Sequence, residues 1–173
     1  MAGKPVEKRE VISITVTSCI QKESLGIAKM MENTIFIKHG PTSLSFRPSS
    51  FERIHLRYTT NGVDIESYPY LYTEDNHFMV SFFEDLSSHW KGWEGAKSWE
   101  PIDGGFRFDA THDSLAYVTL KVFIVKEDCN SDGWDFSGKI KLDLGSLKQL
   151  ASDIKDLLKN EEYECFDKER GMT

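Results

Sequence analysis

The chain reads WDFSGKIKLDL over residues 134–144, where apolar and polar residues alternate. Such alternation is typical of a strand with one face in the core and the other in solvent. The residues expected to point inward are Trp134, Phe136, Ile140, Leu142 and Leu144. Residues 117–126 form an apolar run across a loop that ends in Asp-Gly, so the two segments are predicted to pair as a hairpin.

An Asn-Gly pair at residues 61–62 indicates another hairpin, because such pairs favour a two-residue turn. That turn places Arg57 directly opposite Glu66, so opposite charges face each other across the strands. Shorter β-like runs extend the sheet toward the N-terminus; they are residues 12–19, 34–38 and 43–46.

A third turn signal is the Asp-Gly pair at residues 103–104. A tight turn there sets Trp99 opposite Phe108, and Glu100 opposite Arg107. Apolar groups then share one face and opposite charges the other, which supports an antiparallel sheet.

Two segments carry apolar residues at helical spacing. The first predicts a helix over residues 76–91 that begins near Asp75 and stops at Gly92; its stripe is Phe78, Met79, Phe82, Phe83, Leu86 and Trp90. The second predicts a helix over residues 146–159; its stripe is Leu147, Leu150, Ala151, Ile154, Leu157 and Leu158. The expected fold class is therefore α+β, a single domain with a curved antiparallel sheet of about six to eight strands, one central helix and one C-terminal helix.

The length of 173 residues suits one domain. We expect a flexible tail over residues 1–10, the domain over 11–160 and an acidic, frayed tail over 161–173. No apolar run is long enough for a signal peptide or a membrane span. The three cysteines are widely spaced and odd in number, which favours a reducing compartment; they are Cys19, Cys129 and Cys165. We therefore expect a cytoplasmic protein.

The formal net charge is −7, which disfavours binding to nucleic acid because that role needs an excess of Lys and Arg. Between Thr60 and Leu115 there are eleven Asp and Glu against three Lys and Arg, a balance of −8. The acidity therefore belongs to the middle of the chain. Complementary charge predicts a basic protein as the partner, although solvated carboxylates that only confer solubility are the alternative.

His112 and Asp113, with Asp109 nearby, come closest to an acid-base pair. Their neighbours favour a polar turn instead, in which Thr, His, Asp and Ser side chains bond the local backbone. No set of His, Cys and carboxylates has metal-ligand spacing, and no serine elbow or phosphate-binding loop occurs. The sequence therefore predicts no catalytic residue, metal or cofactor.

Trp93 lies between two glycines and next to Glu94, after the predicted end of the central helix. Trp90 and Trp99 are expected in the core, whereas an exposed Trp93 would suit a binding surface, with a buried loop anchor as the alternative. Glu84, Asp85 and Glu94 belong to the acidic residues without an assigned partner. The candidate binding residues are therefore Glu84, Asp85, Trp93, Glu94, His112 and Asp113.

Residues 82–99 read FFEDLSSHWKGWEGAKSW, which is the pattern FFxxLxxxWxGWxGxxxW. The motif is followed by Ala-Thr-His-Asp at 110–113, by Trp134 and by the Leu-rich final helix. In these features residues 78–158 resemble a family of small bacterial proteins that is grouped as a domain of unknown function and is frequent in actinobacteria. The resemblance implies a meander of strands with one helix in the middle and one at the end. It implies no activity and no catalytic residue.

The function class that the sequence favours is a non-enzymatic bacterial protein-binding domain, of which immunity and antitoxin proteins are one kind. A small, acidic domain without catalytic motifs suits the neutralisation of a basic partner. Two alternatives stay open: an enzyme of unfamiliar type with a site around His112 and Asp113, and a subunit of a larger assembly. The sequence does not indicate the oligomeric state.

Overall fold

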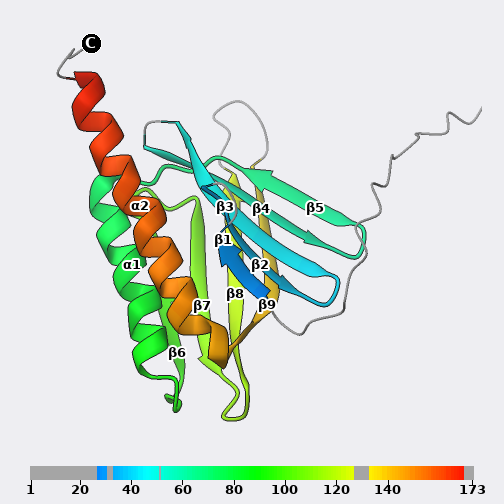
Figure 1. Cartoon of the computed structure of the whole chain (residues 1–173). Helices are drawn as coiled ribbons and strands as arrows, with labels where there is room; N and C mark the ends of the chain where they lie inside the picture. The colour runs from blue at the N-terminus through cyan, green and yellow to red at the C-terminus, as the bar shows by residue number, and fades with distance from the viewer. Residues whose placement is uncertain (1–26, 31–32, 51, 127–132, 170–173) are drawn as a thin grey trace, which may run out of the picture.

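The computed structural model shows an α+β domain in which two antiparallel sheets pack against two helices (Figure 1). It describes residues 27–30, 33–50, 52–126 and 133–169. The α+β class and the positions of a central and a C-terminal helix are confirmed. The strands, which we expected in one curved sheet, are divided between a sheet of five and a sheet of four.

The first sheet, sheet A, is a meander in which each strand pairs with the next along the chain. Its strands are β1 (Ile27–Met30), β2 (Ile35–His39), β3 (Thr42–Ser50), β4 (Arg53–Thr60) and β5 (Val63–Ser67). The turn at residues 61–62 joins β4 to β5 in the predicted register, with Arg57 opposite Glu66. The expected strand over residues 12–19 and the tail over 1–10 lie outside the described residues.

The second sheet, sheet B, is also a meander. Its strands are β6 (Ala96–Trp99), β7 (Phe106–His112), β8 (Tyr117–Lys126) and β9 (Trp134–Asp143). Trp99 lies opposite Phe108 as predicted, but the ladder ends there, so the expected pairing of Glu100 with Arg107 is wrong. The chain turns back earlier, at a bond from the amide of Gly104 to the carbonyl of Pro101.

The central helix, α1, spans Thr73–Ser88 and is therefore shorter at its end than predicted. The Ser88 hydroxyl and the His89 amide both donate to the carbonyl of Asp85, which closes the last turn. Trp90 consequently follows the helix, and its side chain is 55% exposed rather than in the core. Trp99 is half-buried and packs against the core, with its ring 6.0 Å from that of Phe108.

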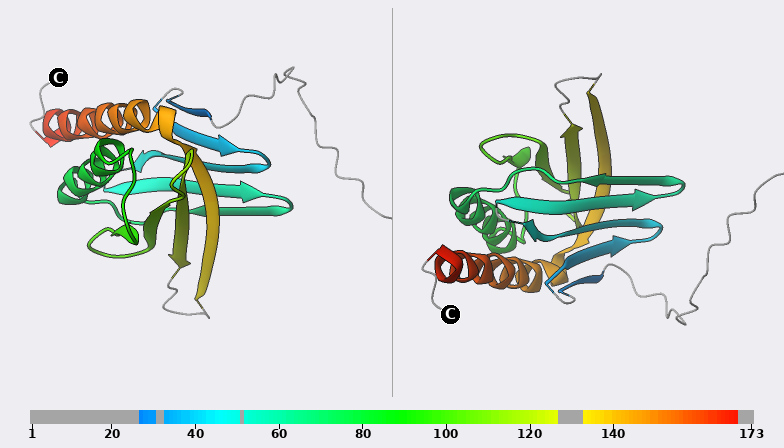
Figure 2. Two further views of the ribbon diagram at one scale, coloured as in Figure 1. Left: turned by 90° about the horizontal axis from the view of Figure 1, so that it is seen from below. Right: turned by 90° about the horizontal axis from the view of Figure 1, so that it is seen from above.

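The C-terminal helix, α2, follows a short 3-10 turn, η1 (Leu144–Ser146), and spans Leu147–Glu169. It runs ten residues beyond the predicted end at 159, so residues 161–169 of the expected tail are helical. Those residues include no Gly or Pro, and four of the nine are Glu, which favours a helix even where no apolar stripe continues. Figure 2 shows α1 and α2 side by side, with the two sheets diverging from them.

The core fills the space between the helices and the inner faces of the two sheets. Phe83 of α1 contacts Phe108 of sheet B, with 6.0 Å between ring centroids, and Phe46 of sheet A contacts the same ring at 6.4 Å. Helix α2 lies against α1 and against β1, β2 and β3. Sheet A, sheet B and α1 therefore meet at Phe108.

Tyr58 joins the two sheets through its hydroxyl group. The hydroxyl donates to the carbonyl of Lys139 at 2.8 Å and accepts from the amide of the same residue at 3.1 Å. This approach requires glycine at position 138, because a Cβ there would lie 2.4 Å from Cζ of the Tyr58 ring. Tyr58 thus satisfies two backbone groups on the outer edge of β9 and fixes β9 against β4.

We predict that Tyr58→Phe lowers the free energy of unfolding by about 1–3 kcal/mol, because it leaves a backbone donor and an acceptor without a partner in a mostly buried place. Tyr68→Phe is the matched control, since Tyr68 is exposed, and its effect should stay within about 0.5 kcal/mol. Urea unfolding of both variants measures the difference. Equal stabilities would show that the hydroxyl of Tyr58 does not hold the sheets together.

Candidate functional site

Asp113 forms a turn with its own backbone. Its Oδ1 accepts from the amides of Leu115, Ala116 and Tyr117, at 2.9, 3.1 and 3.0 Å. These bonds, of which the one from Tyr117 has the largest effect, lower the pKa of Asp113. The turn interpretation of this segment is therefore the one that the geometry supports.

His112 is held by the backbone on both sides of its ring. Its Nδ1 accepts from the amide of Ser114 at 2.8 Å, so the ring proton is on Nε2, which lies 3.1 Å from the carbonyl oxygen of Trp90 and donates to it. Neither nitrogen is left over for proton transfer in this arrangement. The imidazole instead ties the end of β7 to the loop after α1.

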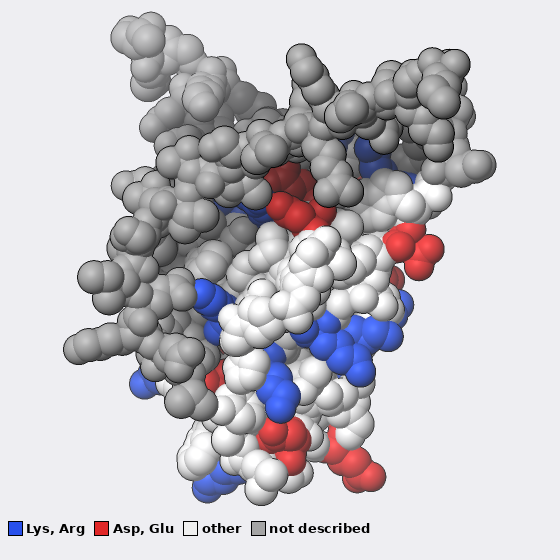
Figure 3. Space-filling model, turned by 90° about the vertical axis from the view of Figure 1, so that its right-hand side faces the viewer, with Lys and Arg blue, Asp and Glu red and all other residues white. Residues whose placement is uncertain are grey.

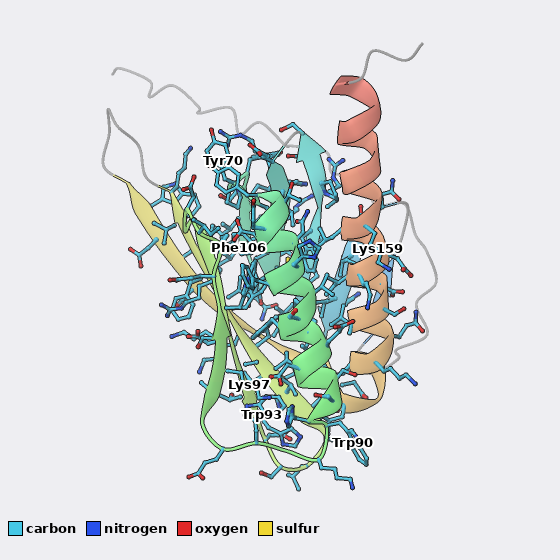
Figure 4. The ribbon with its side chains drawn as sticks, turned by 90° about the vertical axis from the view of Figure 1, so that its left-hand side faces the viewer. Tyr70, Trp90, Trp93, Lys97, Phe106 and Lys159 are labelled. Carbon is cyan, nitrogen blue, oxygen red and sulfur yellow. The ribbon has the colours of Figure 1, made fainter. Side chains whose placement is uncertain are left out.

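Trp93 packs against this histidine, with 5.2 Å between the ring centroids. The indole is half-buried on the core, and Nζ of Lys97 lies 5.0 Å from its ring centroid. Trp93 is thus an anchor of the loop between α1 and β6. Figure 4 shows Trp90, Trp93 and Lys97 together at the C-terminal end of α1.

Two of the candidate carboxylates have partners, contrary to our expectation. Glu84 pairs with Lys155 of α2 at 2.7 Å, and this contact raises the pKa of Lys155. Asp85 bonds Lys97 and also lies 3.0 Å from Nδ1 of His89. Glu94 is exposed, and no ion pair involves it within the described part of the chain. Lys155 and Lys97 were missed because they lie on other elements of the fold, whereas His89 lies only four residues after Asp85.

The structure therefore brings together three of the six candidate residues. Lys97 contacts both Asp85 and Trp93, and Trp93 in turn packs against His112, which Asp113 follows directly. Glu84 lies apart from them, because it faces α2.

Figure 3 shows one side of the molecule, where lysine and arginine side chains gather near the middle, so acidity does not cover the whole surface.

A groove of about 600 Å³ lies between α1 and β6, and Asp85 and Lys97 line one end of it. Helix α1 contributes residues spaced three and four apart, which share one face of the helix; they are Phe78, Ser81, Phe82 and Asp85. The other wall is β6 and the loop that follows it, with Trp99, Glu100 and Ile102. We call this site the α1–β6 groove.

Apolar side chains flank the α1–β6 groove and also form its floor. Phe78 is 58% exposed and Ile102 is 67% exposed, whereas Phe82 is buried and Trp99 is half-buried. Large apolar side chains that are exposed beside a concave surface indicate a binding site. Sequence periodicity had assigned Phe78 to the core. The apolar stripe of α1 is wider than the face that the core buries, and Phe78 lies at the exposed margin of that stripe.

Asp75 holds the two walls of the α1–β6 groove together. It is 1% exposed and accepts from the amide of Tyr72 at 3.1 Å and from the amide of Ile102 at 2.9 Å. The first bond closes the start of α1, and the second fixes the loop after β6. With Asp75 engaged in this way, Asp85 and Glu100 face a single cation, Lys97, among the lining residues. The groove is therefore apolar with an acidic rim.

A second, larger cleft of about 770 Å³ lies between the two sheets. Two of its cations contact aromatic rings: Arg53 lies 3.9 Å from the Tyr70 ring centroid, and Arg107 lies 4.1 Å from that of Phe123. Within the described ranges, no three His, Cys, Asp or Glu residues could hold a metal ion. None of the helices that the structure describes is long and apolar enough to cross a bilayer. The α1–β6 groove contains Asp85, one of the residues predicted from the sequence, and is therefore the candidate site.

We predict that Asp113 stabilises the fold in a pH-dependent way. Its pKa in the folded state lies below the ordinary value of about 3.9, so its contribution is complete above that pH and is lost as the pH falls through the folded pKa. Asp113→Ala should therefore lower the unfolding midpoint at pH 7, and the difference from the unsubstituted protein should shrink between about pH 5 and pH 2. Thermal unfolding across this range measures it, with Glu94→Ala as the control. A difference that is constant with pH would contradict this account.

Comparison with known proteins agrees with the resemblance noted in the sequence. Residues 44–161, more than half of the chain, match a family described as of unknown function, DUF6228. The match includes α1, the α1–β6 groove and all of sheet B. No curated protein matches the chain. The chain therefore belongs to the family of unknown function DUF6228.

Proposed function

We propose that this protein is a non-enzymatic protein-binding domain, which binds a basic segment of a partner protein in the α1–β6 groove. The observation that carries the proposal is the exposure of Phe78 and Ile102 beside a floor formed by Phe82 and Trp99. Covering two such side chains stabilises a complex by about 25 cal/mol for each Å² of apolar surface removed from water.

Charge supports a basic partner at this site. Glu100 is exposed at the rim and has no ion pair among the described residues, whereas Lys97 and His89 contact Asp85. Glu74 in the first turn of α1 and Glu94 after it are also exposed. Complementary charge speeds association and disfavours acidic competitors. The acidic middle of the chain therefore contributes through the rim of the groove rather than through Glu84, which α2 neutralises.

The enzyme alternative has no such support. Both ring nitrogens of His112 bond the backbone, and Asp113 is bound to three amides. A general base needs a free lone pair within reach of a substrate. Neutralisation of a basic protein in the bacterial cytoplasm, as immunity and antitoxin proteins perform it, is the biological setting that we propose.

A library of random twelve-residue peptides displayed on phage tests the proposal. Selection on the immobilised protein should enrich peptides that combine Lys or Arg with large apolar residues. Phe78→Ser and Ile102→Ser should each weaken the binding of the enriched peptides about tenfold, since each removes an apolar contact of roughly 1–2 kcal/mol. Added salt should weaken binding further in every case.

Leu115→Ser is the matched control, because Leu115 is an exposed apolar residue that does not line the α1–β6 groove. It should leave peptide binding unchanged, and thermal unfolding of all three variants checks that each is folded. A selection without enrichment would contradict the proposal. So would enriched peptides that bind the Phe78 and Ile102 variants as tightly as the unsubstituted protein.

A further inference from the structure

We infer that the partner segment binds as an extended strand that pairs with the free edge of β6. This inference rests on the proposed function and specifies how the α1–β6 groove recognises its ligand. Several domain families bind peptides by adding a strand to a sheet edge, with main-chain bonds for affinity and side-chain pockets for specificity. A groove between a helix and an edge strand is suited to that mode.

Strand β6 is an edge strand of sheet B, and β7 is its one neighbour in the described sheet. In an antiparallel edge strand, every second residue directs its amide and carbonyl away from the sheet. The other edge of sheet B is β9, where Tyr58 occupies the backbone groups of Lys139. The backbone groups of β6 have no equivalent side-chain partner among the described hydrogen bonds.

The dimensions of the α1–β6 groove fit a short extended segment. Strand β6 offers four extended residues, Ala96–Trp99, which cover about 13 Å and can pair with about four residues of an added strand. Successive side chains of that strand would point alternately toward α1 and toward solvent. The segment would thus place every second side chain between Phe78 and Ile102 or beside the carboxylates at the rim.

The polar groups of the groove favour the same ligand. Glu100 at the rim is an acceptor for lysine or arginine, so a segment that alternates basic and apolar residues matches both the walls and the rim.

A synthetic peptide of seven residues tests the inference: Lys-Val-Lys-Leu-Lys-Val-Lys, blocked at both ends. It should bind the full-length protein, and hydrogen exchange should slow at alternate amides of β6. Two variants of the peptide carry N-methyl groups on alternate residues, one on the odd-numbered and one on the even-numbered residues. Each set removes the main-chain donors along one edge of the peptide. One methylated set should lose at least tenfold in affinity, and the other should bind like the parent peptide.

The matched control is the same peptide with glutamate in place of each lysine, which should bind much more weakly because the rim is acidic. If both methylated sets bind like the parent peptide while Phe78→Ser still weakens binding, strand addition is wrong and the proposed function stands. If the library yields groove-dependent peptides but the alternating peptide does not bind, strand addition is likewise wrong. If neither the library nor the peptide binds, both proposals fail.

Discussion

The hydroxyl of Tyr58 at the backbone of Lys139 is the contact on which the arrangement of the two sheets depends. Each sheet is a meander, and nothing within either meander determines the angle between them. Tyr58 reaches β9 at the one position, Gly138, where the strand has no side chain in the way. An edge that is occupied in this manner is also unavailable for pairing with another chain. At the other edge of sheet B lies β6, beside α1, with β7 as its partner strand in the described part of the chain.

Helix α1 occupies the space that the diverging sheets leave between them, and its composition reflects two different neighbours. Its central residues, such as Phe83, are surrounded by the core, whereas Phe78 and Trp90 lie where the sheet no longer covers them. One stripe of α1 therefore packs into the core, and the neighbouring stripe borders the α1–β6 groove. The fold and the candidate site therefore share helix α1.

Features that depend on neighbouring residues could be predicted from the sequence, and features that depend on distant ones could not. The register of β4 with β5 follows from the Asn-Gly turn, and the pairing of Trp99 with Phe108 from the Asp-Gly turn. The bond between Tyr58 and Lys139 spans 81 positions, and the pair of Glu84 with Lys155 spans 71. No local pattern encodes either contact. For the same reason the candidate site was only partly located, since Phe78 has the spacing of a core residue and Ile102 lies in a loop without any periodicity.

Asp75 sets the separation of the two walls before any ligand arrives. A single buried carboxylate bonds the start of α1 and the loop that carries Ile102, so these two parts cannot move independently without breaking a bond that water cannot replace. A site fixed in this way loses little conformational freedom when it is filled, and most of the ordering cost falls on the incoming segment. Such a groove selects ligands by their shape when they first bind, because it does not close around a poorly matched ligand.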